Sequence, residues 1–233
     1  IKDICDVETG IMLRLELVGN QHQAFKEFDN LGKSAGVLMR LAKPWKGSGR
    51  TVVADSAFSS VLAAVSLRKD LGLYFLGMVK TAHKSFPREY LNTYSYPDPG
   101  KGNSVTLKAE VDNVQVYAVG WNDKKTKTIV TTCSTSLPGT PHKKKRWANP
   151  RNGQGCSKIY YKEVPRTEMV AEYFDGAQTV DVHNHIRQGN IKLEEAIGTH
   201  RWYVRLFCTI LGICITDAFL AYKAFHPSQP RST

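Results

Sequence analysis

Alternating apolar and polar positions at the start of the chain predict a β-hairpin. Apolar or small residues precede Asp6, a turn follows at residues 8–10, and apolar positions alternate again over residues 12–17. The pattern therefore places Asp6 at the end of a strand.

The next segment changes to helical spacing and leads to a second aspartate at a strand end. Apolar positions recur every three or four residues from Asn30 to Ala42, and Pro44 ends that helix. A Gly-rich turn leads into the strand "TVVA", which Asp55 follows directly. This pattern drives a carboxylate into the end of a buried strand, which is costly unless a partner or a cation neutralises it.

A capped helix and a further strand complete this part. Ser59 or Ser60 caps the helix, Gly72 ends it, and "LYFLGMVK" reads as the strand that follows. The order strand, strand, helix, strand, helix, strand predicts an α/β fold, with a mixed sheet flanked by helices.

The texture changes at residue 81 to Pro, Gly, Asn and Lys with short alternating strands, "SVTLKAEV", "VQVYAVGW" and "KTIVTTC". This mostly β block reads as an insertion before the last helices. We therefore expect four parts: a first part of the core (1–80), a basic insertion region (81–166), a C-terminal helical part of the core (167–226), and a tail or linker (227–233).

The C-terminal part carries a third aspartate, Asp181, before a long apolar helix. The longest apolar run, 207–216, is too short to cross a bilayer, so we expect a buried helix and no membrane association. Three aromatic residues of that helix are expected in the core: Trp202, Phe207 and Phe219. Cys208 and Cys214 are expected to be buried there too.

The charge of the chain points to a polyanionic partner. The formal net charge is +11, and residues 80–166 hold 16 Lys and Arg against 6 Asp and Glu. Nucleic acid is the first candidate partner and an anionic membrane the second, with a solvated surface as the plain alternative. The most basic point is Lys143, Lys144, Lys145 and Arg146, which fits a DNA-backbone contact, a localisation signal or a solvated loop.

Two further observations narrow the class of protein. Five scattered cysteines without a C-x-x-C pair favour a reducing compartment and argue against a zinc module. The chain begins at Ile1 with no basic and apolar leader, so we expect a fragment without a signal peptide.

Asp6, Asp55 and Asp181 together suggest a metal site. Two strand-end carboxylates and a third on a late helix form the set that two-metal phosphoryl transfer requires. Hard oxygen ligands suit Mg²⁺ or Mn²⁺, and the pattern predicts two ions.

Four segments then resemble one family in order and spacing. "CDVETG", "VVADSAFSS", "GAQTVDVHNH" and "HRWYVRLFCTILGICITDAFLAYK" are similar to the DDE-type catalytic domain of piggyBac-like transposases. The resemblance implies an RNase H-like fold with an insertion, and Mg²⁺-dependent cut-and-paste transposition at TTAA targets. It implies that Asp6, Asp55 and Asp181 are the catalytic, metal-binding residues. It further implies double-stranded DNA as partner, a homodimer on that DNA and a nuclear location.

One position departs from the family pattern. Asn184 stands where the family usually has a second acidic residue after Asp181, and a neutral amide holds a divalent cation less strongly. Asn184 is therefore a weaker candidate metal ligand. It leaves open a second hypothesis, a domesticated or decayed derivative that binds DNA without cutting it. A basic membrane-surface protein is a third, for which no segment is suitably amphipathic.

Overall fold

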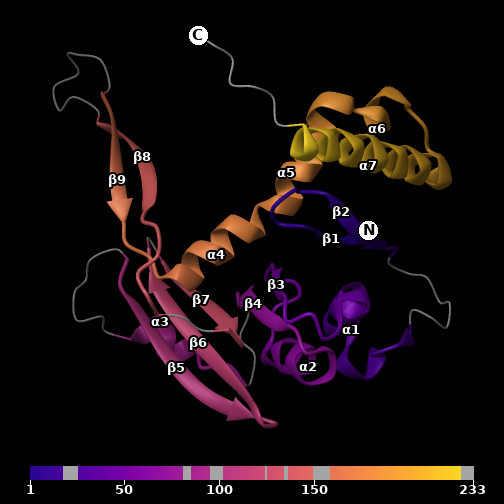
Figure 1. The fold of residues 1–233 in the computed structure, drawn as a ribbon. Helices are drawn as coiled ribbons and strands as arrows, with labels where there is room; N and C mark the ends of the chain where they lie inside the picture. The colour runs from indigo at the N-terminus through magenta and orange to yellow at the C-terminus, as the bar shows by residue number, and fades with distance from the viewer. Residues whose placement is uncertain are drawn as a thin grey trace. The chain divides into compact units, whose positions relative to one another are not determined.

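A computed structural model describes residues 1–17, 26–80, 85–94, 102–123, 125–133, 136–148 and 158–226 (Figure 1). The chain forms two compact units. The first unit contains Ile1–Glu27, Arg40–Ala42 and Asp175–Thr233, and the second contains Phe28–Met39 and Lys43–Phe174.

The second unit contains the mixed sheet that the sequence predicted. The first two strands of this sheet pair in parallel, and every other pair of neighbouring strands in it is antiparallel. In the order in which they pair, the strands are β3 (Thr51–Ala54), β4 (Tyr74–Met78), β7 (Thr126–Thr131), β6 (Val114–Asn122) and β5 (Ser104–Val111).

The pairing of β4 with β7 joins two parts that composition had separated. Strands β5, β6 and β7 lie within the expected insertion 81–166, yet they continue the sheet that β3 and β4 begin. A two-stranded sheet would leave one edge of the buried strand β4 without hydrogen-bond partners, and β7 supplies them. The change in composition at residue 81 therefore does not coincide with an edge of the sheet, because strands from both sides of that position pair with each other.

Local turn chemistry positions the helix α2 (Val61–Leu71) as the sequence predicted. The Ser60 hydroxyl oxygen accepts a hydrogen bond from the Ala63 N–H at 3.1 Å, and Gly72 ends the helix in the left-handed conformation, with φ of 67°. The helix packs against β4, β6 and β7. The remaining helices that begin in this unit are α1 (Lys33–Ala42), α3 (Arg88–Thr93) and α4 (Glu168–Ala177).

Gly77 allows the loop after β3 to approach the sheet closely. A Cβ atom at Gly77 would lie 2.2 Å from the Ser59 hydroxyl oxygen, so no larger residue fits without displacement. Ser59 in turn donates hydrogen bonds to the carbonyl oxygens of Ala54 and Asp55. This contact fixes the chain directly after Asp55.

The basic run of residues 143–146 is a strand rather than a loop. Strands β8 (His142–Ala148) and β9 (Lys158–Val164) form an antiparallel ribbon (Figure 1). In this ribbon Lys145 lies opposite Tyr161. The solvated-loop interpretation is therefore wrong, because pairing with β9 satisfies the backbone of this segment.

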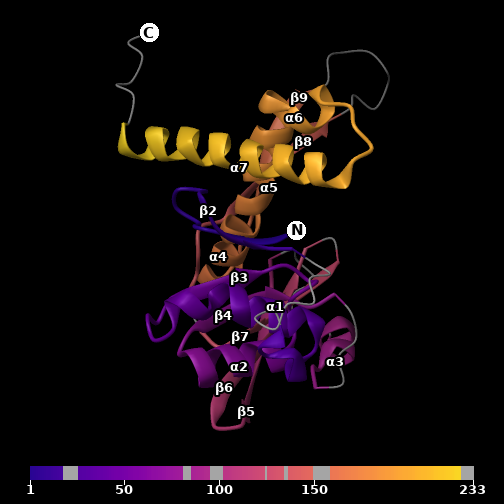
Figure 2. The same ribbon diagram turned by 90° about the vertical axis from the view of Figure 1, so that its right-hand side faces the viewer.

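The first unit begins with the predicted hairpin. Strand β1 (Lys2–Cys5) pairs antiparallel with β2 (Met12–Glu16), and Cys5 lies opposite Met12. The helical part comprises α5 (Thr179–Ile186), a π-helical turn (Arg187–Ile191), α6 (Leu193–Ala196) and α7 (Trp202–Phe225). Helix α6 lies beside α7 in both views (Figures 1 and 2).

Helix α7 differs from its predicted burial. One stripe is buried, including Cys208, but Trp202, Phe207 and Phe219 are exposed, as is Cys214. The expectation of a wholly buried helix is wrong, because the rest of this unit packs against only one side of α7 and leaves the other side exposed.

The same helix meets the length of a membrane span, contrary to the estimate from its longest apolar run. Among the described residues, one helix is long enough and apolar enough to cross a membrane, judged by length and composition alone, and this helix is α7. Its inward stripe nevertheless carries Asp217, whose carboxylate is bonded to other parts of the unit. This carboxylate links one side of α7 to the hairpin and to α5.

Candidate active site

Asp55 lies directly after β3, at the strand end that the sequence predicted, but its side chain is exposed rather than buried. Its Oδ1 accepts a hydrogen bond from the Ala57 N–H at 2.9 Å, which closes a short turn. The expected cost of a buried carboxylate therefore does not arise here. The turn instead holds the carboxylate in one orientation at the surface.

One titratable neighbour of Asp55, Tyr173, is a residue that the sequence did not suggest. Burial, and then the Asp55 carboxylate, raise the pKa of the Tyr173 phenol to about 12. Tyr173 is a buried residue of α4, so this helix packs near the end of β3. Only the packing of α4 reveals this neighbour, because Tyr173 stands in an ordinary amphipathic pattern.

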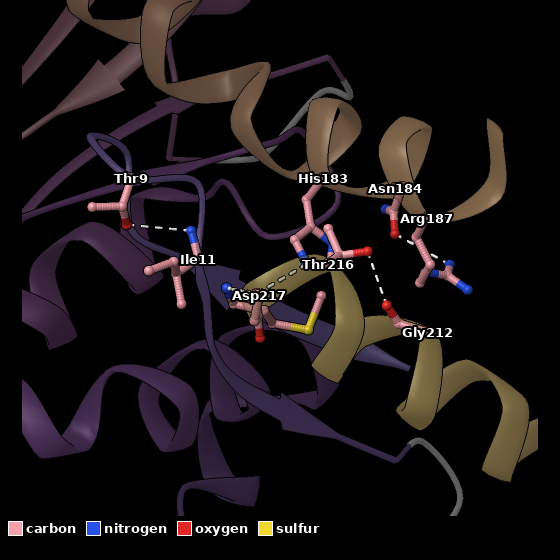
Figure 3. Close-up of polar contacts among 9 residues, drawn as sticks. Thr9, Ile11, His183, Asn184, Arg187, Gly212, Thr216 and Asp217 are labelled. Atoms are coloured by element: carbon pink, nitrogen blue, oxygen red, sulfur yellow. Dashed lines mark hydrogen bonds and ion pairs between the residues drawn. The ribbon is translucent and has the colours of Figure 1, made fainter. Parts of the chain in front are cut away.

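Asp6 lies directly after β1 and is held by its own turn. Its Oδ2 accepts hydrogen bonds from the N–H and the hydroxyl of Thr9, at 2.9 and 2.7 Å. The Thr9 hydroxyl oxygen also accepts a hydrogen bond from the Ile11 N–H (Figure 3). The turn that the sequence predicted at residues 8–10 thus orients the carboxylate.

Asp181 lies in the first turn of α5 and its side chain is exposed. Two positions further on, His183 is fully buried, since two residues turn a helix by about 200°. His183 is therefore a packing residue, and Asp181 points away from the side of α5 that His183 buries.

Asn184 is engaged by an arginine. Its Oδ1 accepts a hydrogen bond from Arg187 at 3.2 Å (Figure 3). Arg187 also pairs with Glu194. Gly212 of α7 leaves room for the Arg187 stem, since a Cβ there would lie 3.1 Å from Arg187 Cγ. A guanidinium beside the amide oxygen disfavours a cation at the same atom.

The three carboxylates suit a divalent metal by their chemistry. Asp6 and Asp181 belong to the first unit and Asp55 to the second. Within the described ranges, no three His, Cys, Asp or Glu side chains lie close enough together to hold a metal ion. Each aspartate nevertheless offers hard oxygen donors at a strand end or a helix start, and two of them are oriented by turns, which fits Mg²⁺ or Mn²⁺. Asn184, bonded to Arg187, fits less well.

Further carboxylates gather near Asp6. Burial first, and then the charges of Asp3, Asp217 and Asp6, raise the pKa of the Cys5 thiol to about 12. Cys5 is thus an unreactive thiol in an acidic neighbourhood at the end of β1.

Asp3 gives a pH-dependent prediction. Burial raises the pKa of its carboxyl above the usual 3.8, and His183 and Arg187 partly offset this rise. A raised pKa in the folded state means that the protonated form favours folding below pH 3.8, and that this contribution is lost as pH rises through the folded pKa. Asp3→Asn should therefore raise the melting temperature at pH 7, with the gain vanishing in acid.

Thermal unfolding at pH 7 and pH 4 measures this effect. Glu8→Gln, which removes the same charge from an exposed position of the hairpin, should give no comparable gain. A lower melting temperature for Asp3→Asn at pH 7 would show that its attraction to His183 and Arg187 outweighs its burial.

The basic residues of β8 are not equivalent. Alternate residues of a strand face opposite sides, so Lys143 and Lys145 share one face and Lys144 lies on the other. Lys144 is largely buried and pairs with Asp123, with its ammonium 5.9 Å from the Trp121 ring centroid. Lys143 lies 3.6 Å from Glu163 in an exposed pair. The Arg146 side chain lies outside the described part of the structure.

Comparison with known proteins now defines the class. A family model described as Transposase IS4 matches residues 3–219. Because this match covers most of the chain and all three aspartates, the chain belongs to the Transposase IS4 family, among its piggyBac-like transposases. No curated protein matches the chain.

A solved structure agrees with this assignment. The chain is similar to a piggyBac transposase in the cryo-EM structure of its synaptic complex with hairpin DNA, with a TM-score of 0.62 and 19% sequence identity. The match covers 94% of this chain and 40% of that chain, so the present chain spans less than half the length of that transposase. At this identity the likeness shows the fold, and the predicted α/β fold of the piggyBac catalytic domain is confirmed.

Proposed function

We propose that this chain is the catalytic core of a cut-and-paste DNA transposase that cleaves and transfers DNA strands with Asp6, Asp55 and Asp181. The observation that carries the proposal is that the family match includes all three aspartates and that each stands at the end of a strand or the start of a helix. Asp55 and Asp181 are exposed, so a phosphate group can approach them.

The three aspartates would hold Mg²⁺ or Mn²⁺, most simply as two ions. When bound, such ions supply activation of the attacking oxygen and stabilisation of the leaving oxygen. The chain itself contributes orientation. Thr9 holds the Asp6 carboxylate and Ala57 holds the Asp55 carboxylate, so each side chain would lose little conformational entropy when the cation and the substrate bind.

The proposed partner is double-stranded DNA, namely the transposon ends and a TTAA target, bound by a homodimer in the nucleus. The support is the family match, the likeness to a transposase solved with hairpin DNA, and the positive charge of residues 80–166. A polyanion is favoured by such a charge excess.

The face of β8 that carries Lys143 and Lys145 is the proposed phosphate-binding surface. Tyr161 lies opposite Lys145 and is exposed, so an aromatic ring is available beside the ammonium groups. Lys144, already paired with Asp123, is proposed to stabilise the ribbon instead. This proposal separates Lys144 from Lys143 and Lys145, which the sequence analysis had grouped together with Arg146.

A salt titration of DNA binding tests that division. Lys143→Gln together with Lys145→Gln should lower the slope of log affinity against log salt by up to about 1.8, because each lost phosphate contact contributes about 0.9. Lys144→Gln is the matched control, and it should lower the melting temperature without changing the slope. An equal slope change for the control would mean that Lys144 reaches DNA as well.

The catalytic proposal is tested by incubating the full-length protein with a TTAA-flanked transposon end, with and without Mg²⁺. Nicking and strand transfer that require the cation support it. Tight DNA binding without cleavage under any cation would overturn it in favour of a domesticated or decayed DNA-binding protein. The pairing of Asn184 with Arg187 is the observation that keeps this second function in view.

A further inference from the structure

One carboxylate oxygen joins three elements of the first unit. Asp217 Oδ1, on α7, accepts a hydrogen bond from the Met12 N–H of β2 at 2.8 Å and lies 3.1 Å from His183 Nε2 of α5 (Figure 3). Because a carboxylate accepts hydrogen bonds, His183 Nε2 carries the proton of this contact. The sequence offered no signal for this cluster, since Met12 and Asp217 are 205 positions apart.

Both bonds end next to a proposed catalytic residue. Met12 lies directly opposite Cys5 in the hairpin, and Cys5 precedes Asp6. His183 follows Asp181 by two positions on α5. The contact with Met12 therefore holds the backbone beside Asp6, and the contact with His183 fixes the rotation of α5, which carries Asp181.

The contact with His183 has a directional consequence. A helix that buries residue 183 must point residue 181 to its opposite side, about 200° away. His183 is fully buried, and its Nδ1 has no hydrogen-bond partner within the described residues, so Asp217 is the polar contact described for this ring. Loss of that contact would leave a buried imidazole unsatisfied and allow α5 to rotate.

Helix α7 also supports the turn that orients Asp6. The Leu220 side chain, one helical turn beyond Asp217, would lie 3.5 Å from a Cβ at Gly10, in the Asp6 turn. Gly10 donates its N–H to the Asp6 carbonyl oxygen at 2.9 Å. Asp217 thus belongs to a packed contact between α7 and the hairpin.

We infer that Asp217 is a positioning residue for the proposed cation site: through Met12 it holds the backbone beside Asp6, and through His183 it sets the side of α5 from which Asp181 projects. This inference rests on the proposed function. Residues that orient metal ligands typically change metal affinity by about 10–100-fold when they are lost. Asp217 therefore acts on the cation site without being a ligand itself.

The test measures binding of Mn²⁺ alone to the full-length protein, by the electron paramagnetic resonance signal of free Mn²⁺, without DNA. Asp217→Leu should weaken Mn²⁺ binding by about tenfold or more. Asp217→Asn should restore most of the affinity, because the amide oxygen still accepts both hydrogen bonds. Asp181→Asn, which removes a proposed ligand, should weaken binding as well.

Thr216→Val is the matched control. Thr216 is buried beside Asp217, but its hydroxyl donates within α7, to the Gly212 carbonyl oxygen at 2.9 Å (Figure 3). This variant should lower stability without changing Mn²⁺ affinity. An equal loss of affinity in Thr216→Val would overturn the inference, because general destabilisation would then explain the effect.

The outcomes separate the inference from the proposed function. If Asp217→Leu binds Mn²⁺ with the same affinity as the parent protein, the positioning role of Asp217 is overturned and the proposed function is not. Unchanged binding in Asp181→Asn overturns the proposed metal site and the inference with it. If Asp217→Leu does not fold, His183→Leu decides: a comparable loss of affinity supports the inference, and parental affinity overturns it.

Discussion

Asp55→Asn is expected to abolish Mg²⁺-dependent DNA cleavage while the melting temperature of the metal-free protein stays equal or rises. The amide oxygen of Asn can still accept the hydrogen bond from the Ala57 N–H, so the turn after β3 should persist. The variant loses the negative charge of an exposed side chain. Binding of a divalent cation requires this charge, whereas folding does not depend on it. The measurements are a cleavage assay on a transposon end and thermal unfolding of the same samples.

Asp70→Asn is the control for this experiment. Asp70 is an exposed carboxylate of α2 in the same unit, so its loss removes the same charge away from the proposed site. Cleavage should remain at the parental level. A clear fall in the melting temperature of Asp55→Asn would instead mark Asp55 as a structural residue, and parental cleavage would remove it from the catalytic set.

The largest effect on stability is expected at Arg40. Arg40 pairs with Glu16 through two hydrogen bonds, of 3.0 Å from Nε and 2.8 Å from Nη2, and both side chains are nearly buried. It also donates to the Glu27 carbonyl oxygen. Arg40→Leu leaves the Glu16 charge without its guanidinium in a poorly solvated position, which typically costs about 3–5 kcal/mol. Urea unfolding of the variant and the parent measures the loss.

A second variant separates charge burial from packing. In Arg40→Leu combined with Glu16→Leu, both charges are removed, so much of the lost free energy of unfolding should return. Arg14→Gln, at an exposed arginine that donates to the Arg40 carbonyl oxygen, should change the free energy of unfolding by about 1 kcal/mol or less. If the double variant is as unstable as Arg40→Leu alone, packing of the arginine stem rather than the uncompensated Glu16 charge accounts for the loss.

The sequence by itself determined the local elements and the candidate residues at their ends. Strand β1 ends before Asp6, β3 ends before Asp55, and α2 lies between its Ser60 cap and Gly72, as the pattern predicted. These features depend on the periods of strands and helices and on turn residues, which act over a few positions of the chain. The family motifs are equally local, which is why the class of protein was also accessible from the sequence.

Only the tertiary structure decided which partners those residues have. The contact of Asp217 with Met12 and His183, the pairing of Lys144 with Asp123 and the hydrogen bond from Arg187 to Asn184 follow no periodic pattern. Polarity and hydrophobicity predict that a residue is buried or charged, but a hydrogen bond also needs an acceptor at a particular distance and angle. That geometry is set when helices and strands pack together, so segments such as Met12 and Asp217 meet only in the folded unit.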